Sequence, residues 1–292
     1  FIDIGGSAYD RWSFLCLLLP YVEEQAMYDE LTQQEVGFSR PWYNSYTRRD
    51  GTRMPTSLCR TRIKSFICPS DPQALATIRD TIGPTSYLGN RGDYALDTHW
   101  HECRGVFGRG NKTPYNMGAV LDGTSNTVMI AETKIGLIGS KRVSESIARD
   151  VSVQNGSPPS ICLAQVGPDG KFLPSTAVET GGWTMGHRWA DSICPYTYFM
   201  TMLAPNGPSC GRRGEDWAIV TAGSHHPGGC MSVFVDGSTH FITDSIDAGD
   251  PTMTVQQMPN YSNGNRPQDF QGPSPYGVWG ALGTIRGGEA VP

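Results

Sequence analysis

Charged residues are scarce in this sequence. Only 17% of its 292 residues are Asp, Glu, Lys or Arg, and the formal net charge is −5. A general nucleic-acid-binding protein needs a basic face, which this balance does not supply, so we expect no nucleic-acid partner. Because aromatic residues make up 10% of the chain, the shortage of charge does not indicate disorder.

Long apolar runs and the common catalytic motifs are also missing. The longest apolar run, residues 14–19, is far shorter than the roughly 20 residues that span a bilayer. No signal-peptide pattern is recognisable. There is no Gly-x-Ser-x-Gly elbow, Walker loop or Rossmann fingerprint, so we expect no enzyme and no catalytic residue. The absence of any Cys-x-x-Cys argues against zinc ribbons and thioredoxin-like sites.

Glycine, proline and cysteine are abundant instead. The chain contains 35 Gly and 21 Pro, which favours many turns and long loops over a helical bundle. An even number of cysteines allows four disulfides in an oxidising compartment, with the pairing left open. The disulfide candidates are Cys16, Cys59, Cys68, Cys103, Cys162, Cys194, Cys210 and Cys230.

The clearest structural signal is a β-hairpin near the C-terminal end. Residues 231–235 and 238–242 suit a pleated sheet, and Asp236-Gly237 between them predicts a tight turn with positive φ at both positions. His226 precedes the hairpin beside Pro227-Gly228. We expect its side chain to hydrogen-bond a backbone carbonyl and lock this bend, and Asp236 to act as a turn residue.

Other elements are predicted from periodicity. Residues 11–31 predict one short helix ending near Leu19 and a second beginning with Pro20 near its first turn. The side chains of residues 124–127 are expected to hydrogen-bond the Asp122-Gly123 turn. Further predictions are strands at 63–68, 85–90 and within 183–203, a second hairpin-like unit at 120–132, a loop at 154–174, and a short helix or strand at 276–284.

Two metal sites are alternatives to a purely structural chain. His99, His101 and Cys103 alternate, so in a strand they would share one face and could bind zinc or copper, with His225, His226 and His240 as further ligands. A calcium site is the other alternative, because three carboxylates follow the hairpin within one loop. They belong to Asp244, Asp247 and Asp250.

Several segments together resemble one known family. His226, nine residues and then Asp236-Gly237 is similar to the C-terminal signature of the prepilin-like surface proteins abundant in planctomycetes. Residues 18–25, 66–72, 121–129, 204–210 and 279–284 match that family in the expected order. The family is formally a domain of unknown function, and its members begin with a type IV pilin-like leader and one long apolar helix.

The resemblance implies a pilin-like α+β fold in a single globular domain, residues 1–292. An N-terminal helical element would pack on a mainly antiparallel sheet with long, disulfide-stapled loops, and the spine helix would be absent or truncated. We expect a non-enzymatic, extracellular structural protein, related to type II secretion pseudopilins and type IV pilins. It would associate with itself or other pilin-like subunits, carry no cofactor, and touch the membrane only through the missing helix.

A polysaccharide-binding surface module is the main alternative function, because aromatic faces stack on sugars. A secreted metal-dependent hydrolase is a further alternative, which requires a bound metal. The aromatic residues that could contact a glycan are Trp42, Tyr43, Tyr46, Trp100, Trp183 and Trp189.

Overall fold

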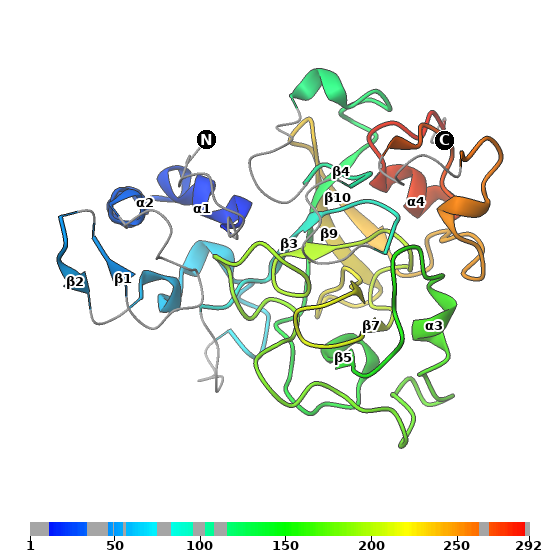
Figure 1. The fold of residues 1–292 in the computed structure, drawn as a ribbon, viewed down its shortest axis with the longest axis horizontal. Helices are drawn as coiled ribbons and strands as arrows, with labels where there is room; N and C mark the ends of the chain where they lie inside the picture. The colour runs from blue at the N-terminus through cyan, green and yellow to red at the C-terminus, as the bar shows by residue number, and fades with distance from the viewer. Residues whose placement is uncertain are drawn as a thin grey trace.

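The chain folds as an α+β protein in a computed structural model (Figure 1). The structure describes residues 12–33, 46–48, 50–54, 57–74, 83–95, 103–107, 116–262 and 269–289. The helices are α1 (Phe14–Leu18), η1 (Leu19–Val22), α2 (Gln25–Thr32), η2 (Leu58–Arg60), η3 (Lys64–Phe66), η4 (Met117–Ala119), η5 (Val143–Glu145), α3 (Ser160–Leu163), η6 (Val255–Gln257) and α4 (Gly277–Gly283). The strands are β1 (Tyr46–Thr47), β2 (Arg53–Met54), β3 (Tyr87–Asn90), β4 (Val128–Glu132), β5 (Ile147–Ala148), β6 (Tyr198–Phe199), β7 (Ser209–Gly211), β8 (Ala218–Ile219), β9 (Gly229–Phe234) and β10 (Thr239–Thr243).

The largest sheet has five strands in the order β10-β9-β4-β3-β6. Its pairings are antiparallel except for the parallel pair β3–β6. A three-stranded sheet, β5-β7-β8, and the β1–β2 pair complete the β structure. Among the described residues, no helix has the length and apolarity that crossing a membrane requires.

The predicted C-terminal hairpin is confirmed, but its turn differs in detail. Strands β9 and β10 pair in register, with Thr239 opposite Val233. Only Gly237 has a positive φ, at 87°, so Asp236 does not adopt the left-handed conformation expected for it. The N–H of Gly237 donates to Phe234 O and the N–H of Phe234 donates to Ser238 O. One extra residue, Gly237, thus sits beside an ordinary turn as a bulge.

The second predicted hairpin is wrong. Residues 128–132 form strand β4, whereas residues 120–127 form turns with no opposing strand. The side chains of Asn126 and Thr127 bond the carbonyls of Asp122 and Gly123, as expected. The Asp122 carboxylate, however, accepts the N–H groups of Gly287 and Gly288. This turn is therefore bound to a distant segment of the chain and not to a neighbouring strand.

The N-terminal prediction is confirmed in part, since α1 ends at Leu18 and Pro20 lies in the first turn of η1. The second predicted helix is divided, because Glu23 has a φ of 65° and ends η1, and α2 begins at Gln25. The strand predicted at residues 63–68 is wrong, because residues 64–66 form the 3-10 helix η3. Ile63 and Phe66 pack with the fully buried Trp189 in a core that also contains α1. Figure 1 shows α1, α2, β1 and β2 together at one side of the molecule, away from α4.

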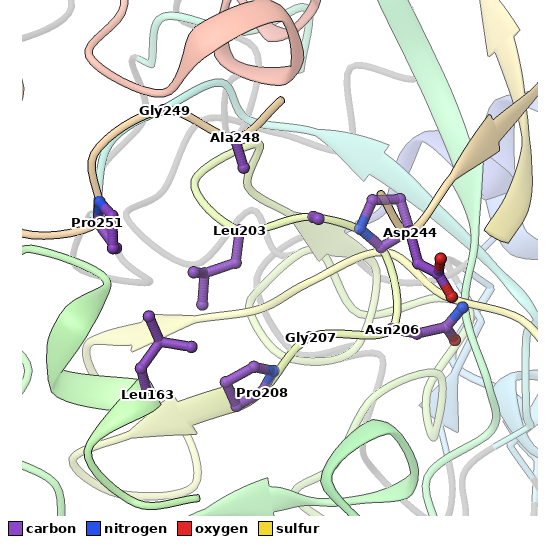
Figure 2. Close-up of a pocket in the computed structure, with 11 residues that line it drawn as sticks. Leu163, Leu203, Asn206, Gly207, Pro208, Asp244, Ala248, Gly249 and Pro251 are labelled. Atoms are coloured by element: carbon purple, nitrogen blue, oxygen red, sulfur yellow. The ribbon is translucent and has the colours of Figure 1, made fainter. Parts of the chain in front are cut away.

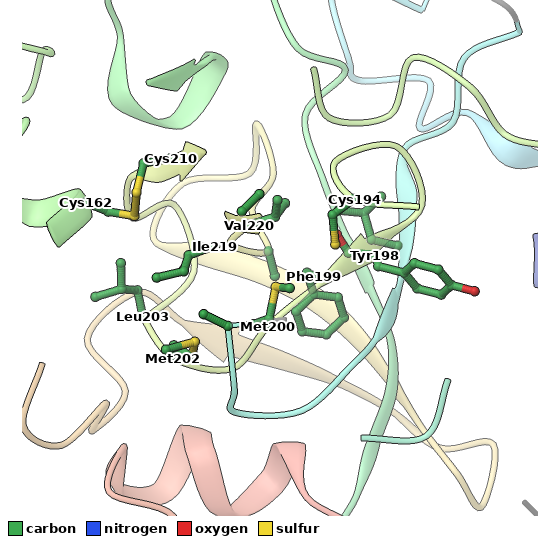
Figure 3. Packing of buried hydrophobic residues seen from close by; sticks show 14 of the residues in the cluster. Cys162, Cys194, Tyr198, Phe199, Met200, Met202, Leu203, Cys210, Ile219 and Val220 are labelled. Carbon is green, nitrogen blue, oxygen red and sulfur yellow. A yellow bond between two sulfur atoms is a disulfide. The ribbon is translucent and has the colours of Figure 1, made fainter. Parts of the chain in front are cut away.

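Buried residues of the two larger sheets form a larger core, and this core contains one disulfide. Cys162 in α3 bonds Cys210 in β7, and both are fully buried (Figure 3). The other six cysteines remain thiols, which corrects the expectation of four disulfides. Five of them are buried, where they pack as small apolar groups. Among the described residues, Cys162–Cys210 is therefore the one disulfide that cross-links the chain.

Candidate functional site

Cys68 differs from the other thiols of the protein. Burial raises the pKa of the buried thiols, to about 12 for Cys59 and Cys230 and to about 11 for Cys194. A protonated buried thiol is chemically inert. Cys68 is only partly buried, directly after η3, and polar side chains from two distant segments face it. It is therefore the thiol best placed for chemistry.

Three side chains converge at this point, and we call them the Cys68–Glu132–His226 cluster. Cys68 Sγ lies 3.8 Å from His226 Nε2, which in turn lies 3.6 Å from a carboxylate oxygen of Glu132. All three ligand atoms lie within 4.8 Å of one another. The side chain of Glu132 is 7% exposed and that of His226 is 39% exposed, so the cluster has one buried side and one open edge.

Each member of the cluster is held by its own local structure. Cys68 O accepts the N–H of Asp71 in a tight turn. Glu132 ends strand β4, and its second carboxylate oxygen accepts the N–H of Met231 in β9 at 2.8 Å. Ser224 Oγ accepts the N–H of His226 and donates to Gly229 O, which fixes the bend before β9. The sheet and two turns therefore set the positions of all three side chains.

A second contact joins the same two turns. His225 Nε2 lies 3.5 Å from a carboxylate oxygen of Asp71, whose other oxygen accepts the N–H of Ile135. Tyr87 pairs with Glu132 across β3 and β4. Burial raises the pKa of Tyr87, and the nearby Cys68 and Glu132 charges raise it further. The cluster is thus surrounded by polar groups from β3 and both turns.

The geometry does not suit a Cys-His-Glu catalytic triad. In such a triad one imidazole nitrogen receives the nucleophile's proton while the other nitrogen is held by the acid. Here the thiol and the carboxylate both face Nε2 of His226. One nitrogen cannot take a proton from Cys68 and donate one to Glu132 at the same time. Three ligand atoms within 4.8 Å of one another could instead hold a metal ion.

Comparison with protein families places the chain. The family model described as a protein of unknown function (DUF1559) matches residues 3–249. The chain belongs to the DUF1559 family. No curated protein and no solved structure matches it.

The structure places His226 of this DUF1559 protein differently from our expectation, and Asp236 in the role expected for it. His226 does not lock its bend through a backbone carbonyl in any contact that the structure describes, since Ser224 performs that role. Asp236 is a turn residue, as predicted, and its carboxylate accepts the N–H and O–H of Ser238. These hydrogen bonds lower the pKa of Asp236.

The two metal sites predicted from sequence do not coincide with the cluster. His99 and His101 lie outside the described residues, and Cys103 is buried with its thiol donating to Phe107 O at 3.2 Å. Asp247 and Asp250 accept N–H groups two residues ahead of themselves. Together with Asp244, they do not form a group of converging ligand atoms in the described part of the chain. Local turn bonds therefore engage one carboxylate oxygen each of Asp247 and Asp250.

Asp244 instead lines a surface pocket of about 400 Å³. Figure 2 shows Asp244 and Asn206 at one end of the pocket and the apolar side chains of Leu163 and Leu203 toward the other. Asn206 also braces the bend before β9, because its side-chain oxygen accepts the N–H of Ser224. The pocket lining contains no thiol or imidazole. Both of these groups are present in the Cys68–Glu132–His226 cluster, which is therefore the stronger candidate for a functional site.

The predicted glycan contacts separate into three groups. Trp189 is a correction, because it is fully buried and its indole N–H donates to Thr61 O. Trp183 is 41% exposed and stays a candidate. Tyr46 lies in β1, with no side-chain placement described, and Trp42, Tyr43 and Trp100 lie outside the described residues.

Sequence reasoning missed Glu132 and the meeting of all three side chains. Cys68 was a disulfide candidate and His226 a secondary metal candidate, yet they lie 158 residues apart. A usable signal did exist, since Cys68 and His226 both fall in segments that carry the family resemblance. Treating those segments as neighbours in space would have suggested a shared site.

Proposed function

We propose that this DUF1559 chain is the globular domain of an exported, non-enzymatic structural protein, a pseudopilin-like subunit displayed or assembled at the cell surface. The observation that carries this proposal is the buried Cys162–Cys210 disulfide. Such bonds form and persist in oxidising compartments, outside the cytosol. The geometry at His226, where the thiol and the carboxylate both face Nε2, argues against a Cys-His-Glu triad and is compatible with this proposal.

The proposed partners are further copies of the chain or other pilin-like subunits. In α1 and η1, Leu17 is 38% exposed and Tyr21 is 84% exposed. Exposed apolar side chains on adjacent turns of helix suit packing against another subunit. In this proposal the pilin-like architecture supplies the assembly mode, and the sheet and disulfide keep the globular part rigid.

Surface labelling of intact cells that produce the protein tests the proposal. We expect an antibody to label the cell surface, and Cys162 and Cys210 of the denatured protein to resist alkylation until a reductant is added. Cys230→Ala is a matched control, because it removes a buried thiol that forms no disulfide. A protein that stays in the cytosol with both Cys162 and Cys210 open to alkylation would contradict the proposal.

Polysaccharide binding is a second candidate, favoured by the exposed indole of Trp183. A glycan array would compare the unchanged chain with Trp183→Ala, using Tyr21→Ala as the control for loss of an exposed ring. Retention that only Trp183→Ala abolishes would support this candidate. Absence of retention on every glycan would reject it.

A further inference from the structure

We infer that the Cys68–Glu132–His226 cluster is a zinc site with three protein ligands and an open fourth position. Zinc takes thiolate, imidazole and carboxylate ligands in a tetrahedral arrangement. Cysteine, histidine and glutamate supply one of each. The mixed set lies between the all-oxygen sites of calcium or magnesium and the sulfur-rich sites of iron–sulfur clusters.

The spacing of the ligand atoms fits that ion. With tetrahedral angles and usual zinc bond lengths, a sulfur and a nitrogen ligand lie about 3.6 Å apart, and a nitrogen and an oxygen ligand about 3.4 Å apart. The corresponding separations here are 3.8 Å and 3.6 Å. The separation of 3.8 Å is also within the range of a hydrogen bond to sulfur, but 3.6 Å is long for an N–H···O hydrogen bond, so a central ion explains the contact between His226 and Glu132 better than direct bonding does.

The surroundings of the cluster resemble the outer shell of a metal site. The carboxylate of Glu132 is oriented by the Met231 N–H, which leaves the oxygen nearer to His226 available to an ion. Outer hydrogen bonds of this kind fix ligand orientation and tune affinity. The backbone of His226 is fixed by Ser224 in the same way. The three ligands are therefore prearranged by the fold.

The open edge decides the type of site. Structural zinc sites are closed by four protein ligands, whereas three ligands leave a place for water or an exogenous ligand. Among the described residues, the group of converging ligand atoms has three members, and His226 gives it a solvent-exposed side. We therefore expect a bound ion that exchanges its fourth ligand. We also expect the ion to protect the Cys68 thiolate from oxidation.

Metal analysis of the purified chain is the direct test. We expect about one zinc ion per chain after dialysis. Replacing zinc by cobalt should produce the charge-transfer absorption of a cobalt–thiolate bond. Cys68→Ser should abolish that absorption, and His226→Asn should weaken zinc binding by at least about 100-fold. Glu132→Gln keeps an oxygen for the Met231 N–H and should weaken binding by about 10- to 100-fold.

Two histidine variants serve as controls. His225→Asn changes the imidazole next to His226, which faces Asp71. His240→Asn changes an exposed imidazole in β10, on the hairpin that follows His226. Both should keep the zinc and the cobalt–thiolate absorption. Circular dichroism of every variant separates loss of ligand from loss of fold.

Three results would overturn the inference. The first is less than about 0.1 zinc per correctly folded chain together with no cobalt–thiolate absorption. The second is an equal zinc affinity in His226→Asn and in the unchanged chain, and the third is a chain that binds copper tightly but does not bind zinc. None of these readouts depends on export or assembly, so the zinc site and the proposed function can fail separately.

Discussion

Two histidines show how the same side chain serves a fold or a site. His187 is fully buried, and its Nε2–H donates to Gly136 O at 2.7 Å. Burial lowers its pKa to about 4, so it stays neutral near pH 7. His226 is 39% exposed and faces a thiol and a carboxylate. His187 makes the kind of hydrogen bond, to a backbone carbonyl, that we predicted for His226, but it makes it elsewhere in the fold.

The largest effect that separates the two histidines should be on stability. We expect His187→Ala to lower the free energy of unfolding by about 3 kcal/mol, because it leaves a buried cavity and an unpaired carbonyl. His226→Asn should change it by less than about 1 kcal/mol in metal-free protein. Urea denaturation measures both values. Equal losses in the two variants would remove the distinction.

The second difference should appear in acid. The folded-state pKa of His187 lies below the unfolded value near 6.5, so the unfolded chain binds more protons between these two values. Stability from the neutral His187 is complete above about pH 6.5 and is lost as the pH falls toward about 4, by about 3 kcal/mol in total. His187→Ala should show a correspondingly flatter pH dependence in urea denaturation, whereas a slope like that of the unchanged chain would contradict this assignment.

The third difference concerns metal, and it rests on the zinc inference. Zinc at a free concentration 100 times its dissociation constant should stabilise the chain by about 2.7 kcal/mol. A chelator should remove this gain from the unchanged protein and from His187→Ala, if that variant folds. Its effect on His226→Asn, which binds zinc at least about 100-fold more weakly, should be less than about 0.5 kcal/mol. Thermal unfolding with and without chelator measures the shift, and a shift of full size in His226→Asn would place the ion elsewhere.

The smallest difference is expected at the bend that carries His226. Ser224→Ala removes two hydrogen bonds, to Gly229 O and from the His226 N–H, and should cost about 1 kcal/mol. Because His226 then loses its backbone restraint, zinc affinity should fall by about tenfold. Isothermal titration of zinc checks this value. Unchanged affinity would mean that Asn206 and β9 hold the bend without Ser224.

Local sequence was sufficient for elements whose partners lie nearby. The hairpin at 229–243 follows from β-branched arms around Asp236-Gly237, and Pro20 divides the N-terminal helices. The Asp122-Gly123 turn contains the same dipeptide but builds no hairpin, and its carboxylate bonds a segment about 165 residues away. A dipeptide contains no information about such a partner.

The candidate site was predicted less well than the fold for the same reason. Cys68 and His226 each appeared in a conspicuous segment, but 158 residues separate them. Glu132 carried no local signal, since it ends an ordinary strand. Trp189 was wrongly assigned to the surface, because an aromatic residue suits a core as well as a sugar-binding face.

The hydrogen bonds between Asp122 and Gly287-Gly288 have a consequence for folding during synthesis. Trp279 in α4 is fully buried, and its indole N–H donates to Leu203 O. The growing chain can pair β3 with β4 early, but Asp122 obtains its backbone partners only after residue 288 has left the ribosome. A translation product that stops before α4 would therefore contain all the strands that the structure describes but lack Trp279 and both backbone partners of Asp122.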